Sequence, residues 1–246
     1  MVSIVLFGSL VNRHERVTTS TDVDLLVIIR DSCTSRDFQK LKRNLIHLEN
    51  SLLPNSITNE SVFIRSLQSA TGMFCNFFIC RISDFKRRNF NEVFSVNSFM
   101  GTFLAPQNSV WLSLLHHHRI IWGKNVFKEW QTFPRMTQYD LLRSFLMNML
   151  LSTGALFLFP FYSPITKFSM EAVKWSLFTW KNIHHPEKTL NQIVTIYYKD
   201  ASTIERCVLN NFMKFRKKMK TSNDFSLLAC IFVLMLHLSL FRRSHG

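Results

Sequence analysis

Apolar residues near the N-terminus fall in short runs. Residues 2–7 form one such run, which ends at Gly8, and residues 22–29 form a second run that is rich in Leu, Val and Ile. Short apolar runs bounded by turn residues are typical of buried β-strands. We therefore predict strands at both runs, joined by a polar connection, and two further strands at 62–64 and 72–82.

The rest of the chain shows the longer spacing of apolar residues that is typical of helices. Residues 35–53 repeat apolar side chains every three or four positions, and the pattern stops at Pro54. Beyond Pro106 it is helical almost throughout. Ser169 and Glu171 are residue types that cap and begin a helix. The helices expected after Pro106 span residues 108–121, 139–159, 169–182, 201–220 and 224–241.

This order of elements predicts an α+β protein with two domains. Strands and a helix alternate in residues 1–105, which indicates a small domain with a mixed sheet. Residues 106–246 are predicted to form an all-α domain. With 246 residues and 47% apolar side chains, the chain can bury a sizeable core.

Charge and cysteine content indicate the setting in which the protein works. Lys and Arg outnumber Asp and Glu by 30 to 16, so the formal net charge is +14. Such an excess attracts polyanions, which include nucleotides, nucleic acids and anionic membranes. The 5 cysteines include no CxxC pair, so neither a disulfide framework nor a structural zinc site is expected. The predicted location is the reducing environment of the cytoplasm.

Candidate chemistry lies where the first two strands meet their connection. Gly8 has no Cβ, so a phosphate can approach its backbone closely, and Ser9 adds a hydroxyl and a backbone N–H. Asp22 and Asp24 are two positions apart, which places both side chains on one face of a strand. Neighbouring carboxylates repel one another unless a cation lies between them, and Mg²⁺ prefers such oxygen ligands. We predict that Gly8 and Ser9 bind nucleotide, and that Asp22 and Asp24 bind metal and act in catalysis.

These residues resemble the signature of a known superfamily. Phe7-Gly8-Ser9 and residues 21–28 (Thr-Asp-Val-Asp-Leu-Leu-Val-Ile) are similar to the DNA polymerase β-like nucleotidyltransferases, especially the minimal and antibiotic nucleotidyltransferases. The resemblance covers roughly the first thirty residues. It implies a nucleotidyltransferase domain followed by a helical domain, with Mg²⁺ as cofactor. It also implies transfer of NMP from an NTP, expected to be ATP, to an acceptor hydroxyl with release of pyrophosphate. The acceptor stays open: a small molecule, a protein or RNA.

The family pattern includes a third carboxylate, which serves as metal ligand or general base on a later strand. The strand expected at 72–82 offers Asn76 but no acid; Asp84 follows that strand and Glu60 precedes it. We take Glu60 as the candidate catalytic base. Two alternatives stay open. The missing acid favours a catalytically impaired nucleotide-binding or antitoxin-like interaction module, and the charge of +14 favours an RNA-directed nucleotidyltransferase.

Three other patterns have structural interpretations that we favour over functional ones. Consecutive histidines at 116–118 point about 100° apart on a helix and cannot converge on one ion, so a polar helix edge is expected. The basic run at 214–220 fits the solvated end of a helix. The apolar segment 225–241 is short of the ~20 residues that span a bilayer and contains His237. A buried helix is therefore expected there, without a membrane partner, and a homo-oligomer stays open.

Overall fold

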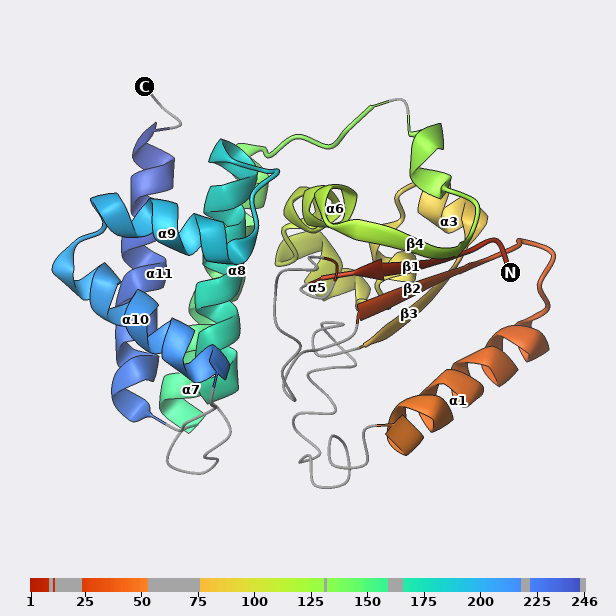
Figure 1. Ribbon diagram of the computed structural model, residues 1–246, viewed down its shortest axis with the longest axis horizontal. Helices are drawn as coiled ribbons and strands as arrows, with labels where there is room; N and C mark the ends of the chain where they lie inside the picture. The colour runs from red at the N-terminus through yellow and green to blue at the C-terminus, as the bar shows by residue number, and fades with distance from the viewer. Residues whose placement is uncertain are drawn as a thin grey trace. The chain divides into compact units, whose positions relative to one another are not determined.

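The computed structural model describes residues 1–8, 11, 24–52, 76–130, 132–158, 166–217 and 222–243 (Figure 1). These residues form two compact units. The first unit holds the described residues from Met1 to Thr102 together with His117–Thr132. The second holds Phe103–His116 and the described residues from Phe133 onward. A single boundary after residue 105 does not reproduce this division, because His117–Thr132 returns to the first unit.

A mixed sheet of four strands forms from the described part of the chain. The strands are β1 (Ser3–Phe7), β2 (Asp24–Ile29), β3 (Phe77–Arg81) and β4 (His118–Gly123), in the order β3-β2-β1-β4. β1 is antiparallel to both of its neighbours, whereas β2 and β3 are parallel. The strands expected at 2–7, 22–29 and 72–82 are confirmed where the structure describes them. The strand expected at 62–64 lies outside the described residues.

The fourth strand corrects the helix that the sequence predicts at 108–121. Helix α6 (Gln107–His116) ends at His116, and the chain then enters β4. In β4, His118 pairs with Phe7 and Ile120 pairs with Val5 of β1. Side chains such as isoleucine fit a pleated strand, and the pairing with β1 outweighs the local helical spacing. The interpretation of residues 116–118 as one helix edge is therefore wrong.

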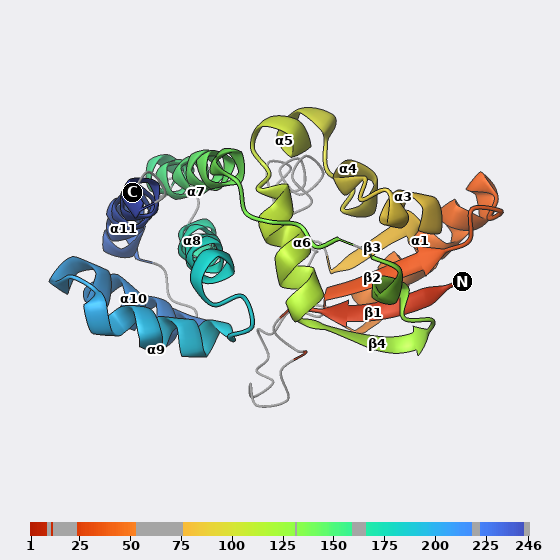
Figure 2. The same cartoon turned by 90° about the horizontal axis from the view of Figure 1, so that it is seen from above.

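Apolar side chains cover both faces of the sheet. On one face, Val27 and Ile79 pack against Phe38 and Leu41 of helix α1 (Ser35–Leu52), which confirms the helix expected at 35–53 where the structure describes it (Figure 1). The other face carries Phe78, whose ring centroid lies 5.4 Å from that of Phe94. Short helices α3 (Ile82–Lys86) and α4 (Phe90–Val93) follow β3 and contact it (Figure 2). The remaining short elements are α5 (Ser98–Phe103) and the 3₁₀ helix η2 (Val126–Glu129).

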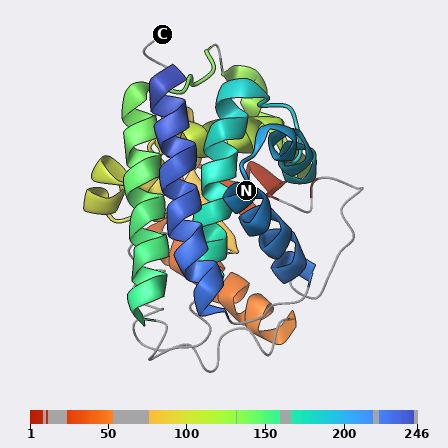
Figure 3. The ribbon, with the colours of Figure 1, turned by 90° about the vertical axis from the view of Figure 1, so that its left-hand side faces the viewer.

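All regular secondary structure in the described part of the second unit is helical. Helices α7 (Gln138–Leu158), α8 (Thr166–His184) and α11 (Asn223–Arg243) run side by side and contact one another (Figure 3). Helices α9 (Leu190–Asp200) and α10 (Thr203–Lys217) pack on α8 and α11 respectively. The core includes Val173, Leu209 and Phe232, all of which are fully buried. The helices expected at 139–159 and 224–241 are confirmed where the structure describes them. The helix expected at 201–220 begins later, at Thr203, and its described part ends at Lys217.

The predicted start of the helix at 169–182 is wrong. Helix α8 begins at Thr166, so Ser169 and Glu171 lie inside it. The hydroxyl of Ser169 is buried and donates a hydrogen bond to Ser226 in α11 (2.9 Å), and Glu171 forms an ion pair with Lys174. Ser169 therefore links α8 to α11, and Glu171 forms an ion pair within α8.

Helix α9 has no counterpart among the helices that the sequence predicts. Thr189 and Gln192 form a capping box at its start, in which each side chain accepts a hydrogen bond from the other residue's backbone N–H. Ile193 and Val194 bury its inner face. The cap is local in the chain, and a search for a Thr-x-x-Gln pair before an apolar run would have found it.

A buried polar network joins the three long helices of the second unit. Ser144 of α7 lies 2.6 Å from the hydroxyl of Thr179 in α8 and 3.2 Å from Nε2 of His237 in α11. Nδ1 of His237 donates to the carbonyl of Val233 (2.9 Å), because a carbonyl can only accept. His237 is fully buried, and this burial lowers its pKa to about 4, against the opposing effect of the Val233 hydrogen bond. The ring is therefore neutral in the folded protein at neutral pH.

This neutral histidine predicts a loss of stability in acid. The unfolded chain binds a proton at His237 below about pH 6.5, whereas the folded protein does so only near pH 4. Because the unfolded state binds more protons between these values, the free energy of unfolding falls as the pH falls from about 6.5 to about 4, by about 3 kcal/mol in total. Urea unfolding at a series of pH values measures the effect. The His237→Gln variant should show a pH dependence weaker by this amount; equal curves for both proteins would contradict the prediction.

Candidate active site

The end of β1 brings Gly8 against the first residue of β2. Phe7 pairs with Asp24, and Gly8 follows with a φ of 80°, a value that side-chain-bearing residues rarely adopt. A Cβ atom on Gly8 would lie 2.3 Å from Oδ2 of Asp24. The Asp24 carboxylate therefore rests directly on the backbone of Gly8, and only glycine leaves room for it.

Asp24 belongs to a row of residues that crosses the sheet. Phe7 pairs with Asp24 on one side and with His118 on the other, so these three side chains project from the same face. Two strand spacings separate the backbones of Asp24 and His118 by about 10 Å. The Phe7 ring contacts Phe78 (5.9 Å between centroids), and the His118 ring stacks on Phe127 (3.9 Å). These aromatic contacts hold the row in place at the end of the sheet.

β3 lies in the segment where a third carboxylate is expected. Asn76 directly precedes β3, and its carbonyl accepts a hydrogen bond from the backbone N–H of Leu25 (2.8 Å). Asn76 therefore lies beside the start of β2, at the same end of the sheet as Asp24. An amide oxygen is a weaker ligand for a cation than a carboxylate, but Mg²⁺ and Ca²⁺ sites both use neutral oxygens beside charged ones.

Asp84 lies at the opposite end of the sheet and cannot complete this site. β2 and β3 are parallel, so the residues that follow β3 lie beyond the end of β2, about 17 Å from Asp24. The contacts of Asp31, which follows β2, mark this far end. Its carboxylate accepts hydrogen bonds from the hydroxyl (2.6 Å) and the backbone N–H (3.1 Å) of Ser83, and these bonds lower the pKa of Asp31.

Three of the predicted site residues lie outside the described part of the chain: Ser9, Asp22 and Glu60. Within the described ranges, no group of three or more His, Cys, Asp or Glu side chains is arranged to hold a metal ion. Asp24 is the predicted metal ligand that the structure describes, and its carboxylate offers hard oxygen atoms of the kind that Mg²⁺ binds. The structure thus brings Gly8 and Asp24 together as the sequence predicts.

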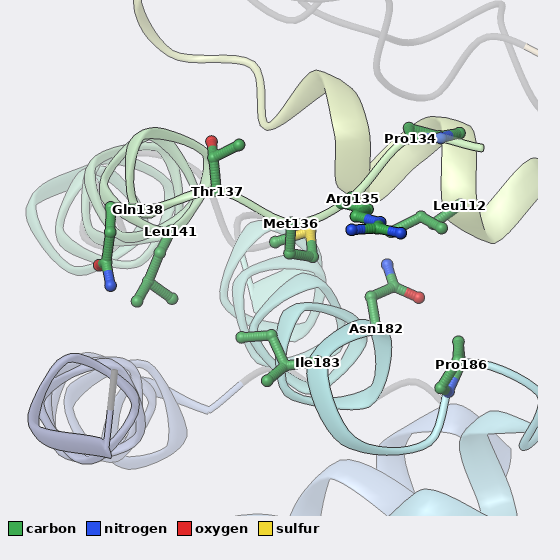
Figure 4. Close-up of a pocket in the computed structure, with 10 residues that line it drawn as sticks. All are labelled: Leu112, Pro134, Arg135, Met136, Thr137, Gln138, Leu141, Asn182, Ile183 and Pro186. Carbon is green, nitrogen blue, oxygen red and sulfur yellow. The ribbon is translucent and has the colours of Figure 1, made fainter. Parts of the chain in front are cut away.

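The second unit contains a pocket of about 400 Å³ (Figure 4). Its walls include the apolar side chains of Leu112, Leu141 and Ile183. Arg135 and Asn182 also line it, and their side chains point toward one another in the close-up. The pocket is open to solvent, because Arg135, Thr137 and Gln138 of its lining are exposed.

The second unit also contains a buried lysine that the sequence does not predict. Lys181 of α8 is fully buried, its Nζ has no hydrogen-bond partner among the described residues, and it lies 5.5 Å from the ring centroid of Phe178. Burial lowers the pKa of Lys181 to about 8, against the opposing charge of Glu187. Burial and the charge of Lys181 also lower the pKa of His116. No sequence signal distinguishes such a lysine, because lysines in amphipathic helices are normally exposed.

Of the described helices, α11 alone is long and apolar enough to cross a membrane, as judged by length and composition. Its most apolar stretch has a mean hydropathy of 2.1, and 44% of that stretch is buried within the protein. The buried side of α11 carries His237 and Ser226, whose hydrogen bonds reach α7 and α8. These contacts are those of a helix that belongs to the core of the second unit.

Comparisons with known proteins add no family to this description. No protein-family model matches the sequence, and no curated protein matches it either. The chemistry of the site therefore has to be inferred from the residues themselves.

Proposed function

We propose that this protein is an Mg²⁺-dependent nucleotidyltransferase, which transfers NMP from an NTP to an acceptor hydroxyl. One observation carries the proposal: the carboxylate of Asp24, at the start of β2, lies against Gly8 at the end of the neighbouring strand β1. A phosphate that approaches the glycine backbone would therefore meet the carboxylate. A carboxylate beside such a phosphate could share a Mg²⁺ ion with it, which supports the proposal.

The proposed reaction is an in-line displacement at the α-phosphorus. Gly8 and Ser9 would hold the phosphates, and Asp22 and Asp24 would hold Mg²⁺, which would supply positive charge at the reacting oxygens. The acceptor oxygen forms a bond to the α-phosphorus while the bond to the bridging oxygen of pyrophosphate breaks. Glu60 is the proposed base that takes the acceptor's proton. The first unit would then be the nucleotidyltransferase domain, and the second a helical domain.

A second candidate function rests on Asn76. Asn76, just before β3, lies beside the start of β2, and neither Asn76 nor any residue of β3 is an acid. A protein with two acids in place of three could bind nucleotide and metal without transferring the nucleotide. The net charge of +14 adds the related possibility that RNA is the acceptor.

Labelled nucleotides test the proposal and separate these candidates. The full-length protein would be incubated with each NTP, labelled at either the α- or the γ-phosphate, with Mg²⁺ and with RNA, protein and polyhydroxylated small molecules as acceptors. We expect the α-label to enter an acceptor and the γ-label to leave as pyrophosphate, with both processes stopped by EDTA. Nucleotide binding without transfer would support the impaired module. Transfer of the γ-label, or failure to bind any NTP, would refute the proposal.

A further inference from the structure

Helix α1 of the first unit carries a row of basic side chains on one side. Arg36, Lys40 and Arg43 are all exposed, and they are spaced by four and then three residues. At about 100° per residue, the three positions fall within about 60° of one another around the helix axis. We call these three residues the basic row. It presents three positive charges within about 10 Å along the helix.

The apolar residues of α1 lie on the opposite side of the helix. Phe38, Leu41 and Leu45 pack against a core cluster of the sheet that includes Val27 and Ile79. Around the helix axis, these apolar positions are centred about 170° from the basic row. The sheet therefore covers the apolar side of α1, and the basic row points away from the sheet.

The charges of the basic row are not arranged to stabilise the helix. Like charges four residues apart repel one another, as Arg36 and Lys40 do, and Arg36 lies in the first turn, where the helix dipole favours a carboxylate. Within the described ranges, none of the three side chains forms an ion pair. The carboxylate of Asp37 instead accepts a hydrogen bond from the hydroxyl of Thr34 (2.7 Å). The basic row is therefore complementary to an anion outside the chain.

The composition of α1 favours a duplex over other polyanions. Helices that lie on anionic membranes insert apolar side chains, but the sheet covers the apolar side of α1. Single strands are usually bound on aromatic side chains beside the charges, and Phe38, the only Phe, Tyr or Trp of α1, packs against the sheet. A duplex requires neither feature, because it presents about one negative charge per 1.7 Å of its axis.

We propose that the basic row binds the phosphate backbone of double-stranded nucleic acid. Arg36 and Arg43 can each bind a phosphate through two parallel hydrogen bonds, and Lys40 adds a point charge between them. Phosphate contacts carry no sequence information, so binding should not depend on the base sequence. The proposed contacts use neither Gly8 nor Asp24, so duplex binding and the proposed nucleotide transfer can fail separately.

Fluorescence anisotropy with labelled RNA and DNA duplexes of about 20 base pairs tests the proposal. The full chain would be titrated in EDTA between about 50 and 200 mM salt. We expect both duplexes to bind, with an affinity that falls steeply as salt rises. The triple variant Arg36→Gln/Lys40→Gln/Arg43→Gln should bind about tenfold or more weakly at the lowest salt. Its slope of log affinity against log salt should be less steep by about 2–3, because three phosphate contacts are lost.

The triple variant Lys199→Gln/Lys214→Gln/Lys217→Gln is the matched control. These lysines of α9 and α10 are also exposed, and their replacement removes three positive charges, as the replacement of the basic row does. The control should bind duplexes within about twofold of the wild type, because charges far from the contact are largely screened. Asp24→Asn should also bind like the wild type, which separates duplex binding from nucleotide transfer.

Three results would overturn the proposal. The first is a wild-type protein that binds neither duplex at the lowest salt, or that binds a single strand of the same length more tightly. The second is a control variant that loses as much affinity as the basic-row variant. The third is a protein that binds phosphatidylserine vesicles through the basic row but no duplex, because a lipid surface would then be the partner. Circular dichroism of each variant confirms that it is folded before its affinity is interpreted.

Discussion

Asp24→Asn is expected to reduce nucleotide transfer by about 10³-fold or more while the protein stays folded. The substitution keeps the size of the side chain beside Gly8 but removes the negative charge that would bind Mg²⁺. A metal ion contributes several kcal/mol to the stabilisation of the transition state, and each 1.4 kcal/mol or so changes the rate tenfold. Single-turnover transfer of α-labelled NTP measures the loss. Titration with Mn²⁺, followed by its paramagnetic signal, should show weaker metal binding.

Asp84→Asn is the matched control for this prediction. Asp84 is also a half-buried acid of the first unit, but it lies at the opposite end of the sheet. Its substitution should leave transfer within about twofold of the wild type, because charges separated by more than a Debye length are largely screened. If Asp24→Asn retained full activity, or if Asp84→Asn lost as much, the site at Gly8 would not be the place of the chemistry.

The contact between Gly8 and Asp24 is also the part of the site that the sequence predicts best. Two apolar runs that are joined by one polar connection indicate two consecutive strands. Consecutive strands commonly pair with each other, so the contact between their ends is expected. The neighbours of Asp24 are harder to foresee. His118 reaches the same row only because β4 pairs with β1 across more than a hundred residues, and no local pattern encodes that pairing. Strand propensity depends on tertiary context in this way.

Phe232→Ala is expected to lower the free energy of unfolding by about 3–5 kcal/mol. Phe232 of α11 is fully buried in the core of the second unit, where its ring lies 6.0 Å from that of Tyr197 in α9. Removing it leaves a cavity in this core, where Phe232 packs among buried side chains that include Leu177, Ile193 and Leu209. Urea unfolding, followed by circular dichroism, measures the change.

Ile204→Ala provides the comparison for an exposed apolar residue. Ile204 lies in α10 of the same unit and is 43% exposed, so its loss should cost less than about 1 kcal/mol. If α11 packed against lipid and not in the core of the second unit, the two variants would unfold differently from this expectation. Phe232→Ala would then have little effect on unfolding in water, and the assignment of α11 to the core would be wrong.

The helices of the second unit show where periodicity succeeds and where it fails. The apolar spacing in α7 and α11 predicts each helix to within a few residues, because a long repeated pattern leaves little choice of conformation. Ser169 misleads because the same hydroxyl that suits a helix start also suits a buried bond to another helix. The neutral state of His237 and the burial of Lys181 depend on which helices surround them. The sequence alone therefore predicts neither property.

The return of β4 to the sheet affects how the protein can be divided. The chain leaves the first unit after Thr102, re-enters it at His117 and leaves again after Thr132. A fragment that ends at residue 105 would lack β4, and the hydrogen-bonding groups on one side of β1 would face solvent. Bare strand edges of this kind recruit other strands and promote aggregation. A soluble sheet unit would therefore need residues 117–132 supplied on a grafted linker or as a separate peptide, so that β1 keeps its neighbour.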